Sequence, residues 1–257
     1  MNTGPDADDF NALFRGGAFG NYDIFTARSY ADFVHRNDID LAHAVVVRER
    51  GALLGALAFG VRGTRAWFGL IGVDPDSRRE GLGARMLGDA LAAVQAQGVR
   101  AIELEVSQRN AAPIGLCKNF GFEQHNELFV WARDARDVPA GLPAARRFPE
   151  PAIRAIVPPQ AVCWQRESRS IARAGRIALL SVPGAYAFVR IDGEFAHVLD
   201  AHAVDATRAG DLVRALNERV PYDLTLNNEP AASALSAALG DGGWRVVERQ
   251  FLMVRSL

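Results

Sequence analysis

The sequence of 257 residues is poor in cysteine, in lysine and in net charge. Its two cysteines, Cys117 and Cys163, are too few for a disulfide framework or a cysteine-rich zinc site. Its five histidines show none of the spacings that mark a metal site, so we expect no metal. Lys118 is the only lysine, and 29 basic residues offset 30 acidic ones to a formal net charge of −1. This balance argues against a nucleic-acid-binding protein, which would carry a basic excess.

Long hydrophobic runs are also missing. The longest apolar stretch, residues 52–59, is far too short to span a bilayer. Residues 1–10 are polar and acidic and lack the basic and apolar segments of a signal peptide. We therefore expect no membrane association and a cytoplasmic location. With 49% hydrophobic and 23% charged residues, the composition is that of a globular protein with one large core or two small ones.

The hydrophobic pattern of the first half predicts a mixed α/β fold. Two short helices are expected, and apolar residues at helical spacing predict two more, each closed by a glycine. These helices cover residues 9–15, 27–36, 83–97 and 112–119. Alternating or β-branched residues predict strands at 42–48, 51–61, 66–73, 101–106 and 127–132, with a hairpin turn at 49–51. This order implies a mixed sheet with helices packed on it.

The second half repeats this pattern after an interruption. Residues 133–160 hold six of the 12 prolines and no period, which predicts a linker or an extended wrapping segment. Strands are then expected at 177–182, 186–191, 195–199, 222–226 and 250–255, with helices at 207–219 and 231–239. The order strand, Asn, helix, Gly-aromatic, strand occurs in both 104–133 and 224–255. We therefore predict two copies of one domain, at 1–135 and 161–257, joined by a Pro-rich linker at 136–160.

The stretch most informative about function is residues 73–84, Val-Asp-Pro-Asp-Ser-Arg-Arg-Glu-Gly-Leu-Gly-Ala. A strand ends there, and a polar loop with Gly81 and Gly83 leads into a long amphipathic helix. Glycines allow close approach, and the first amides of a helix are unpaired and carry a partial positive charge. The pattern predicts an anion site suited to a pyrophosphate. No Gly-Lys-Ser/Thr follows, which excludes a Walker P-loop, and the glycine spacing disfavours a dinucleotide fingerprint.

The full phrase Val-x-Pro-x-x-Arg-x-x-Gly-x-Gly closely resembles the acyl-CoA loop of the GCN5-related N-acetyltransferase (GNAT) superfamily. A second phrase resembles another signature of this family, and its residues are Leu104, Glu105, Val106, Asn110, Leu116, Gly121 and Phe122. The resemblance is tight over residues 71–122 and looser over 22–132. It implies two GNAT-like acyl-CoA N-acyltransferase domains in tandem.

The second half lacks the loop phrase, which implies a degenerate C-terminal copy. Between residues 199 and 212 it carries Asp200, Asp205 and Asp211 with a single glycine. Acidic residues at that place would repel a phosphate. We therefore expect one acyl-CoA site, in the N-terminal half.

The resemblance also implies which residues hold the coenzyme. The end of the third strand would bond the pantetheine arm, the loop and first helical turn would wrap the pyrophosphate, and an asparagine would bond the pantetheine. These residues are Ile71, Gly72, Val73, Arg78, Arg79, Gly81, Leu82, Gly83, Ala84 and Asn110. The alternative for each of these residues is a purely structural role. The strand residues would belong to the core, the loop would be a solvated basic turn, and Asn110 would be a helix N-cap.

Glu105 and Cys117 are the catalytic candidates. In similar enzymes the glutamate at the position of Glu105 is a general base acting through water, which an amine nucleophile needs. Glu103 lies on the same strand face, and its repulsion would raise one of the two pKa values; both are otherwise solvent-facing bystanders. Cys117 replaces the tyrosine that protonates the leaving thiolate, so it is either that acid or a small packing residue. In the second case a water or another tyrosine would donate: Tyr22, Tyr30 or Tyr186.

The resemblance implies an N-acetyltransferase. It would move the acetyl group of acetyl-CoA to a primary amine by direct attack, without an acyl-enzyme. The acceptor would be a small molecule or a peptide; its identity, the acyl length and the choice between monomer and homodimer stay open. The replaced tyrosine keeps a non-catalytic acyl-CoA-binding sensor or scaffold as an alternative. A protein–protein adaptor on a decayed transferase fold is a third hypothesis.

Overall fold

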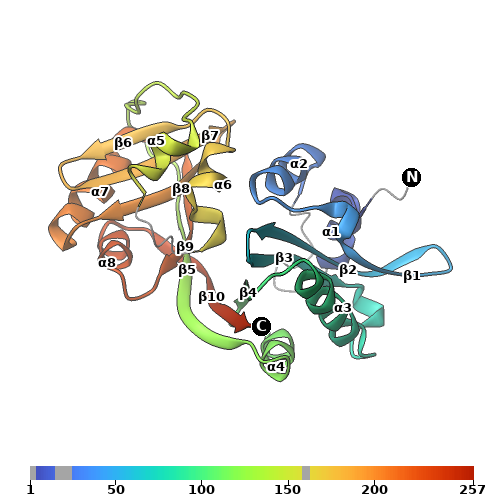
Figure 1. Ribbon diagram of the computed structural model, residues 1–257. Helices are drawn as coiled ribbons and strands as arrows, with labels where there is room; N and C mark the ends of the chain where they lie inside the picture. The colour runs from blue at the N-terminus through green and yellow to red at the C-terminus, as the bar shows by residue number, and fades with distance from the viewer. Residues whose placement is uncertain (1–3, 15–24, 158–162) are drawn as a thin grey trace. The chain divides into compact units, whose positions relative to one another are not determined.

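The computed structural model describes residues 4–14, 25–157 and 163–257, which form two compact units (Figure 1). Unit 1 comprises Met1–His125 and Phe251–Leu257, and unit 2 comprises Asn126–Gln250. Of the helices in the described ranges, none has both the length and the apolar character that crossing a membrane requires.

Unit 1 is built on a mixed sheet. Its strands β1 (Val45–Glu49), β2 (Ala52–Arg62) and β3 (Arg65–Val73) are antiparallel neighbours. Strand β4 (Ala101–Ser107) is parallel to β3, because α3 (Leu82–Ala96) carries the chain back across the sheet. After β4 come α4 (Ala111–Asn119) and β5 (Glu123–Arg133). The end of the last strand, β10 (Arg245–Ser256), lies beside β4.

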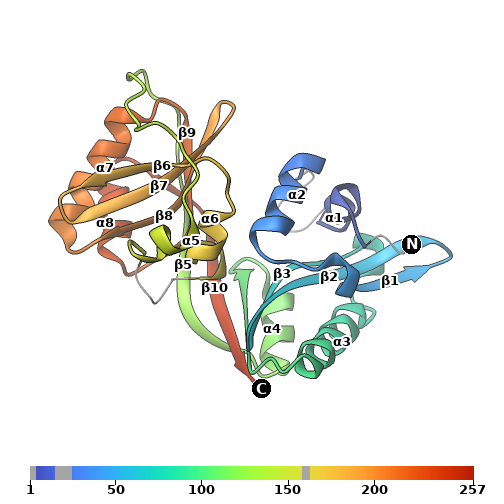
Figure 2. The same ribbon diagram turned by 45° about the horizontal axis from the view of Figure 1, so that its top comes forward.

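Helices cover both faces of this sheet (Figure 2). On one face lie α1 (Ala7–Phe14) and α2 (Ala27–Arg36), and on the other lie α3 and α4. The core beneath α3 buries residues at helical spacing, namely Leu87, Ala90, Leu91 and Val94. The chain end completes this core, since Met253 is 0% exposed and the Leu257 amide donates to the Arg100 carbonyl at 2.8 Å.

Unit 2 repeats the architecture of unit 1. Strands β6 (Ala178–Val182), β7 (Ala185–Asp192) and β8 (Phe195–Ala203) are antiparallel, and β9 (Asp223–Pro230) is parallel to β8. Helix α7 (Ala206–Arg219) makes the crossover, α8 (Ala234–Asp241) follows β9, and β5 pairs with β9. The same order of antiparallel hairpins, crossover and parallel strand in both units confirms the predicted mixed α/β fold with two copies of one architecture.

The proline-rich segment packs on unit 2. It contains α5 (Glu150–Arg154), and Phe148, Ile153 and Val157 are buried in one cluster with Phe188 of β7. Residues 158–162 lie outside the described part of the chain. The short elements η3 (Trp164–Arg166) and α6 (Ser168–Ala172) follow.

The predicted helices and strands all occur, with ends moved by a few residues. The strand expected at 42–48 begins only at Val45, because Leu41–His43 forms a 3-10 turn (η1) capped by the carboxylate of Asp40. The hairpin expected at 49–51 is present. Its turn residues Arg50 and Gly51 have φ of 48° and 89°, the left-handed geometry of a tight two-residue hairpin.

Candidate functional site

A β-bulge at Gly69 shapes the end of β3. Phe59 of β2 pairs with Phe68, whereas Ala58 pairs with Leu70, so Gly69 is an extra residue without a cross-strand partner on β2. Such a residue shifts by one the alternation of side chains between the two faces of the sheet. The bulge therefore decides which face the following residues, Ile71, Gly72 and Val73, present.

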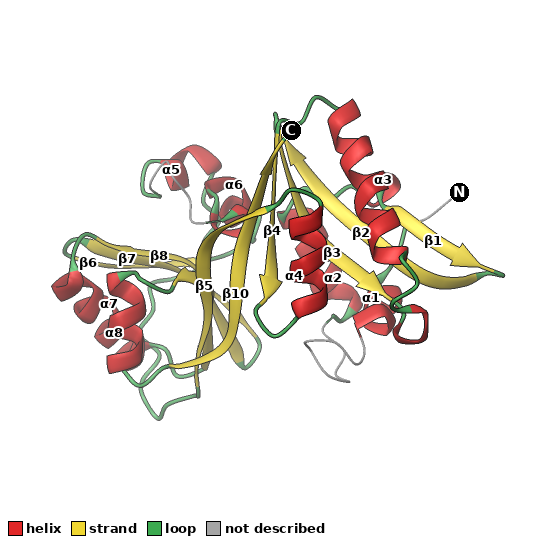
Figure 3. Cartoon of the chain, turned by 90° about the horizontal axis from the view of Figure 1, so that it is seen from below, coloured by secondary structure: helices red, strands yellow, loops and turns green. Residues whose placement is uncertain are grey.

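Strands β3 and β4 diverge just beyond this region. Their parallel pairing ends at Trp67 and Glu103, although the strands continue to Val73 and Ser107 (Figure 3). The edges that run apart carry backbone amides and carbonyls that a ladder would otherwise use. An extended ligand with amide groups of its own can continue the pairing there, as an added strand does.

The loop after β3 opens onto the start of α3. Arg79 and Gly81 have φ of 71° and 82°, and Gly81 is the N-cap of α3 without a side-chain capping bond. The first intrahelical bond runs from the Arg85 amide to the Gly81 carbonyl at 3.0 Å. The amides of residues 82–84 precede it and point out of the helix end, where the helix dipole attracts an anion.

Gly83 brings three predicted site elements together. A Cβ on this residue would lie 3.3 Å from Leu116 Cδ2 of α4 and 4.0 Å from Val73 Cγ2 of β3. The first turn of α3 therefore packs closely against both α4 and the diverging end of β3. Leu82 and Ala84 flank Gly83 in the same turn.

Arg78 holds the loop by binding backbone carbonyls. Its Nε donates to the Val73 carbonyl at 3.1 Å, and its Nη2 donates to the Leu13 carbonyl at 3.2 Å. Its side chain thus ties the end of β3 to α1. Arg79 differs from it, because it is exposed and its guanidinium can reach a ligand phosphate.

Glu105 and Glu103 both accept hydrogen bonds from side chains of β3. Glu105 Oε2 accepts from Trp67 Nε1 at 2.7 Å, and Glu103 Oε1 accepts from Arg65 Nη2 at 3.1 Å. The adjacent strand β3 thus supplies a donor to each of the two carboxylates. Neither Trp67 nor Gly69 was among the predicted site residues, although a glycine inside an apolar strand is a signal of a bulge.

Asn110 and Cys117 lie on α4. Asn110 is at the N-cap position, but its side chain makes no capping hydrogen bond, so the helix does not use its amide group. Cys117 is 4% exposed in the core beneath α3. Burial raises the pKa of its thiol to about 11, so the thiol is protonated at neutral pH.

The other tyrosines considered as proton donors have different surroundings. The Tyr30 hydroxyl donates to the Pro5 carbonyl at 2.7 Å, and burial raises its pKa. Tyr186 belongs to unit 2, where its hydroxyl donates to Asp200 Oδ2 at 2.8 Å. Tyr22 lies outside the described residues.

Unit 2 has the same bulge and the same divergence. Val189 pairs with Val198 but Phe188 pairs with Asp200, so Leu199 is the extra residue. The parallel pairing of β8 with β9 then ends at Val198 and Leu226. The bulge and the strand divergence of unit 1 are therefore both present in unit 2.

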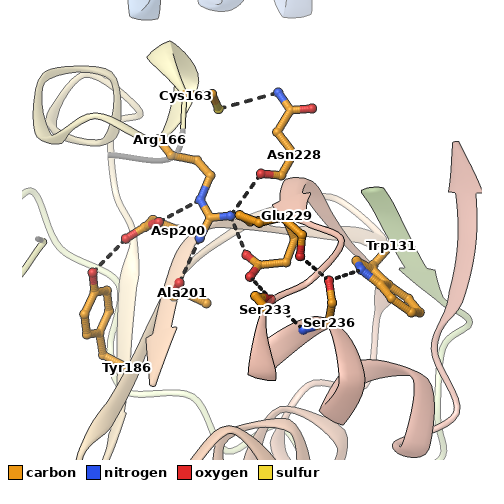
Figure 4. Close-up of polar contacts among 11 residues, drawn as sticks. Trp131, Cys163, Arg166, Tyr186, Asp200, Ala201, Asn228, Glu229, Ser233 and Ser236 are labelled. Atoms are coloured by element: carbon orange, nitrogen blue, oxygen red, sulfur yellow. Dashed lines mark hydrogen bonds and ion pairs between the residues drawn. The ribbon is translucent and has the colours of Figure 1, made fainter. Parts of the chain in front are cut away.

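The guanidinium of Arg166 fills this second divergence (Figure 4). It donates to the Ala201 carbonyl of β8 at 2.8 Å and to the Asn228 carbonyl of β9 at 3.2 Å. It also pairs with Asp200 at 2.8 Å and with Glu229 at 2.5 Å. Burial lowers the pKa of Arg166, but the two carboxylates outweigh this effect and raise it overall.

The carbonyls that Arg166 binds correspond to positions on the diverging strands β3 and β4 of unit 1. The first parallel pair is Arg65–Ala101 in unit 1 and Phe195–Asp223 in unit 2. At the same number of residues along the strands from these pairs, Ala201 of unit 2 corresponds to Ile71 of unit 1, and Asn228 corresponds to Val106. Arg166 thus occupies the space between the diverging strands of unit 2. In unit 1 the corresponding space lies beside α3 and the loop that follows β3.

The start of α7 is also occupied. Asp205 is its N-cap, and its carboxylate accepts from the Arg208 amide at 2.8 Å. Asp200 was expected to repel a phosphate in this loop, but it lies within β8 and binds Arg166. Among the described residues, no group of three or more His, Cys, Asp or Glu side chains is arranged to hold a metal ion.

Comparison with known proteins agrees with this geometry. The model of the acetyltransferase (GNAT) family matches residues 9–122. No curated protein sequence matches the chain. A GCN5-related N-acetyltransferase from Sphaerobacter thermophilus has a similar fold, with a TM-score of 0.67, 13% identity and coverage of 97% of this chain and 91% of its own.

Two further structures match almost the whole chain. A protein of Pyrococcus horikoshii assigned as an acetyltransferase matches with a TM-score of 0.71 and 15% identity, covering 98% of this chain and 88% of its own. A tandem GNAT protein from the clavulanic acid biosynthesis pathway matches with a TM-score of 0.61 and 14% identity, covering 96% and 93%. The family model therefore covers most of unit 1, and the chain as a whole shares the fold of these three structures, one of which is a tandem GNAT protein.

Proposed function

We propose that the N-terminal domain, residues 1–135, transfers an acetyl group from acetyl-CoA to a primary amine of a small molecule or peptide. The observation that carries the proposal is the position of the uncapped α3 start beside the divergence of β3 and β4. One end of such a site suits a diphosphate, and the other suits an extended arm with amide groups.

The donor would lie along the residues that the sequence singled out. Amides of Gly81, Leu82, Gly83 and Ala84 would bind the pyrophosphate, and exposed Arg79 would add its charge. Ile71, Gly72, Val73 and Asn110 would bond the pantetheine arm. Arg78 would contribute by holding the loop on β3, since its guanidinium binds two carbonyls.

The reaction would be a direct displacement. The amine nitrogen attacks the thioester carbonyl carbon, an N–C bond forms, and the C–S bond breaks. Glu105 would accept the amine proton through a water, and the coenzyme thiolate would leave with a proton from solvent or from Cys117. A thiol with a pKa of about 11 stays protonated and can donate, but Cys117 is buried in the core.

Each chain would hold one acyl-CoA, in unit 1. In unit 2, Arg166 occupies the strand gap, and Asp205 caps the helix that would meet the diphosphate. A bound arm would have to displace a side chain that makes charged bonds to Asp200 and Glu229.

The burial of Cys117 at the tyrosine position also favours a second candidate, a non-catalytic acyl-CoA sensor. Release of free thiol from acetyl-CoA with a panel of amines separates the two functions. The transferase releases thiol with at least one amine, and Glu105→Gln slows this release far more than Glu103→Gln does. Binding without thiol release for any amine would favour the sensor.

A further inference from the structure

The indole of Trp67 makes a buried contact with the proposed base. Trp67 and Glu105 extend from neighbouring strands, β3 and β4, and their side chains meet at 2.7 Å between Nε1 and Oε2. Trp67 is 1% exposed, so the bond forms away from bulk solvent. We propose that Trp67 is a positioning residue that orients the Glu105 carboxylate for proton transfer; this inference rests on the proposed function.

The surroundings of Trp67 fix the direction of its N–H. A Cβ on Gly69 would lie 2.2 Å from Trp67 Cζ3, so the ring lies over the space left by the missing side chain. Phe33 of α2 packs on the ring with a centroid distance of 5.8 Å. The bulge residue thus admits the ring, and the ring in turn holds one carboxylate oxygen.

A neutral donor suits a base better than a cation does. An indole nitrogen only donates, so it holds Glu105 without competing for the proton that the base receives. Glu103, on the same face, accepts a hydrogen bond from the charged guanidinium of Arg65. In the bond from Trp67, the Glu105 carboxylate therefore has a neutral donor.

A double-mutant cycle on the full-length enzyme tests this role. We expect Trp67→Phe to lower kcat about tenfold, the loss that removal of a hydrogen bond to a charged group produces, with the KM for acetyl-CoA changed less than twofold. In the Glu105→Gln background the same change should cost nothing further, because the oriented group is gone. Independent, multiplicative losses would show a merely structural role and overturn the inference.

A second readout does not depend on turnover. The chain has four tryptophans, so the Trp67 indole N–H resonance can be assigned by its loss in Trp67→Phe. Glu105→Gln should move this resonance, and the matched control Glu103→Gln should leave it in place. An unmoved resonance, or wild-type kcat in Trp67→Phe, overturns the inference alone. Absence of turnover in the wild-type enzyme overturns the proposed function, and the inference with it.

Discussion

The buried arginine of unit 2 provides a sharp test of the structure. Replacing Arg166 by Met keeps an apolar stem of similar length but leaves Asp200 and Glu229, which are 6% and 5% exposed in their side chains, without their cation. It also removes donors from the carbonyls of Ala201 and Asn228. Breaking one side of a buried ion pair costs about 3–5 kcal/mol, because an uncompensated charge stays behind.

Urea unfolding followed by circular dichroism measures this loss. With a urea slope of about 2 kcal/mol per molar, the midpoint of the unit 2 transition should fall by about 2 M. Arg154→Met is the matched control, since Arg154 pairs with Glu150 on the surface of α5 and is 71% exposed. We expect this control to lose at most about 0.5 kcal/mol.

Two results would refute this reasoning. If Arg166→Met unfolded at the wild-type urea concentration, the guanidinium would not be the partner of two buried carboxylates. If Arg154→Met lost as much stability as Arg166→Met, loss of any arginine in this region would explain the effect, and burial would not.

Two further predictions concern unit 1. In a Cys163→Ser background, Cys117 should react with iodoacetamide at pH 8 about a hundredfold more slowly in the folded than in the unfolded chain. The reason is that burial raises the pKa of the Cys117 thiol from 9.0 to about 11. Equal reaction rates in the two states would contradict the burial of Cys117. Deletion of residues 251–257 removes Met253 from the core beneath α3 and should cost unit 1 at least about 2–5 kcal/mol. Limited proteolysis should then cut unit 1 and spare unit 2, and equal protection of both would contradict the division of the chain.

Local patterns in the sequence predicted the elements and the loop. The alternation in 66–73 and the helical spacing in 83–97 are properties of neighbouring residues, so β3 and α3 follow from them. The glycines at 81 and 83 likewise predict an open helix start, which α3 has. The residues proposed to bind the coenzyme stay predictions until a ligand is measured.

Contacts between distant residues were not predictable in this way. The bond between Trp67 and Glu105 depends on the register of two parallel strands, which has no local signature, and on a bulge at Gly69, for which a glycine inside an apolar strand is a local signal but gives no contact partner. The packing of residues 251–257 in unit 1 could not be read from hydrophobic alternation, which gives a strand but not its neighbour.

The Arg166 cluster shows the same limit. Its ion pairs join residues 34 and 63 positions apart, and such buried charges resemble solvated surface in the sequence. The expected strand ended at residue 199, just before Asp200, whereas Asp200 lies in β8 as a buried partner of Arg166.

Calorimetric titration with acetyl-CoA tests the central claim most directly. One molecule should bind per chain, and this binding should be lost when Gly81 and Gly83 are both replaced by Val. Gly81 has φ of 82°, and a Cβ on Gly83 would lie 3.3 Å from Leu116 Cδ2. The control Gly63→Val, at a hairpin turn with φ of 60°, should bind as the wild type does. No heat with the wild-type chain, two molecules per chain, or unchanged binding by the double variant would contradict the account.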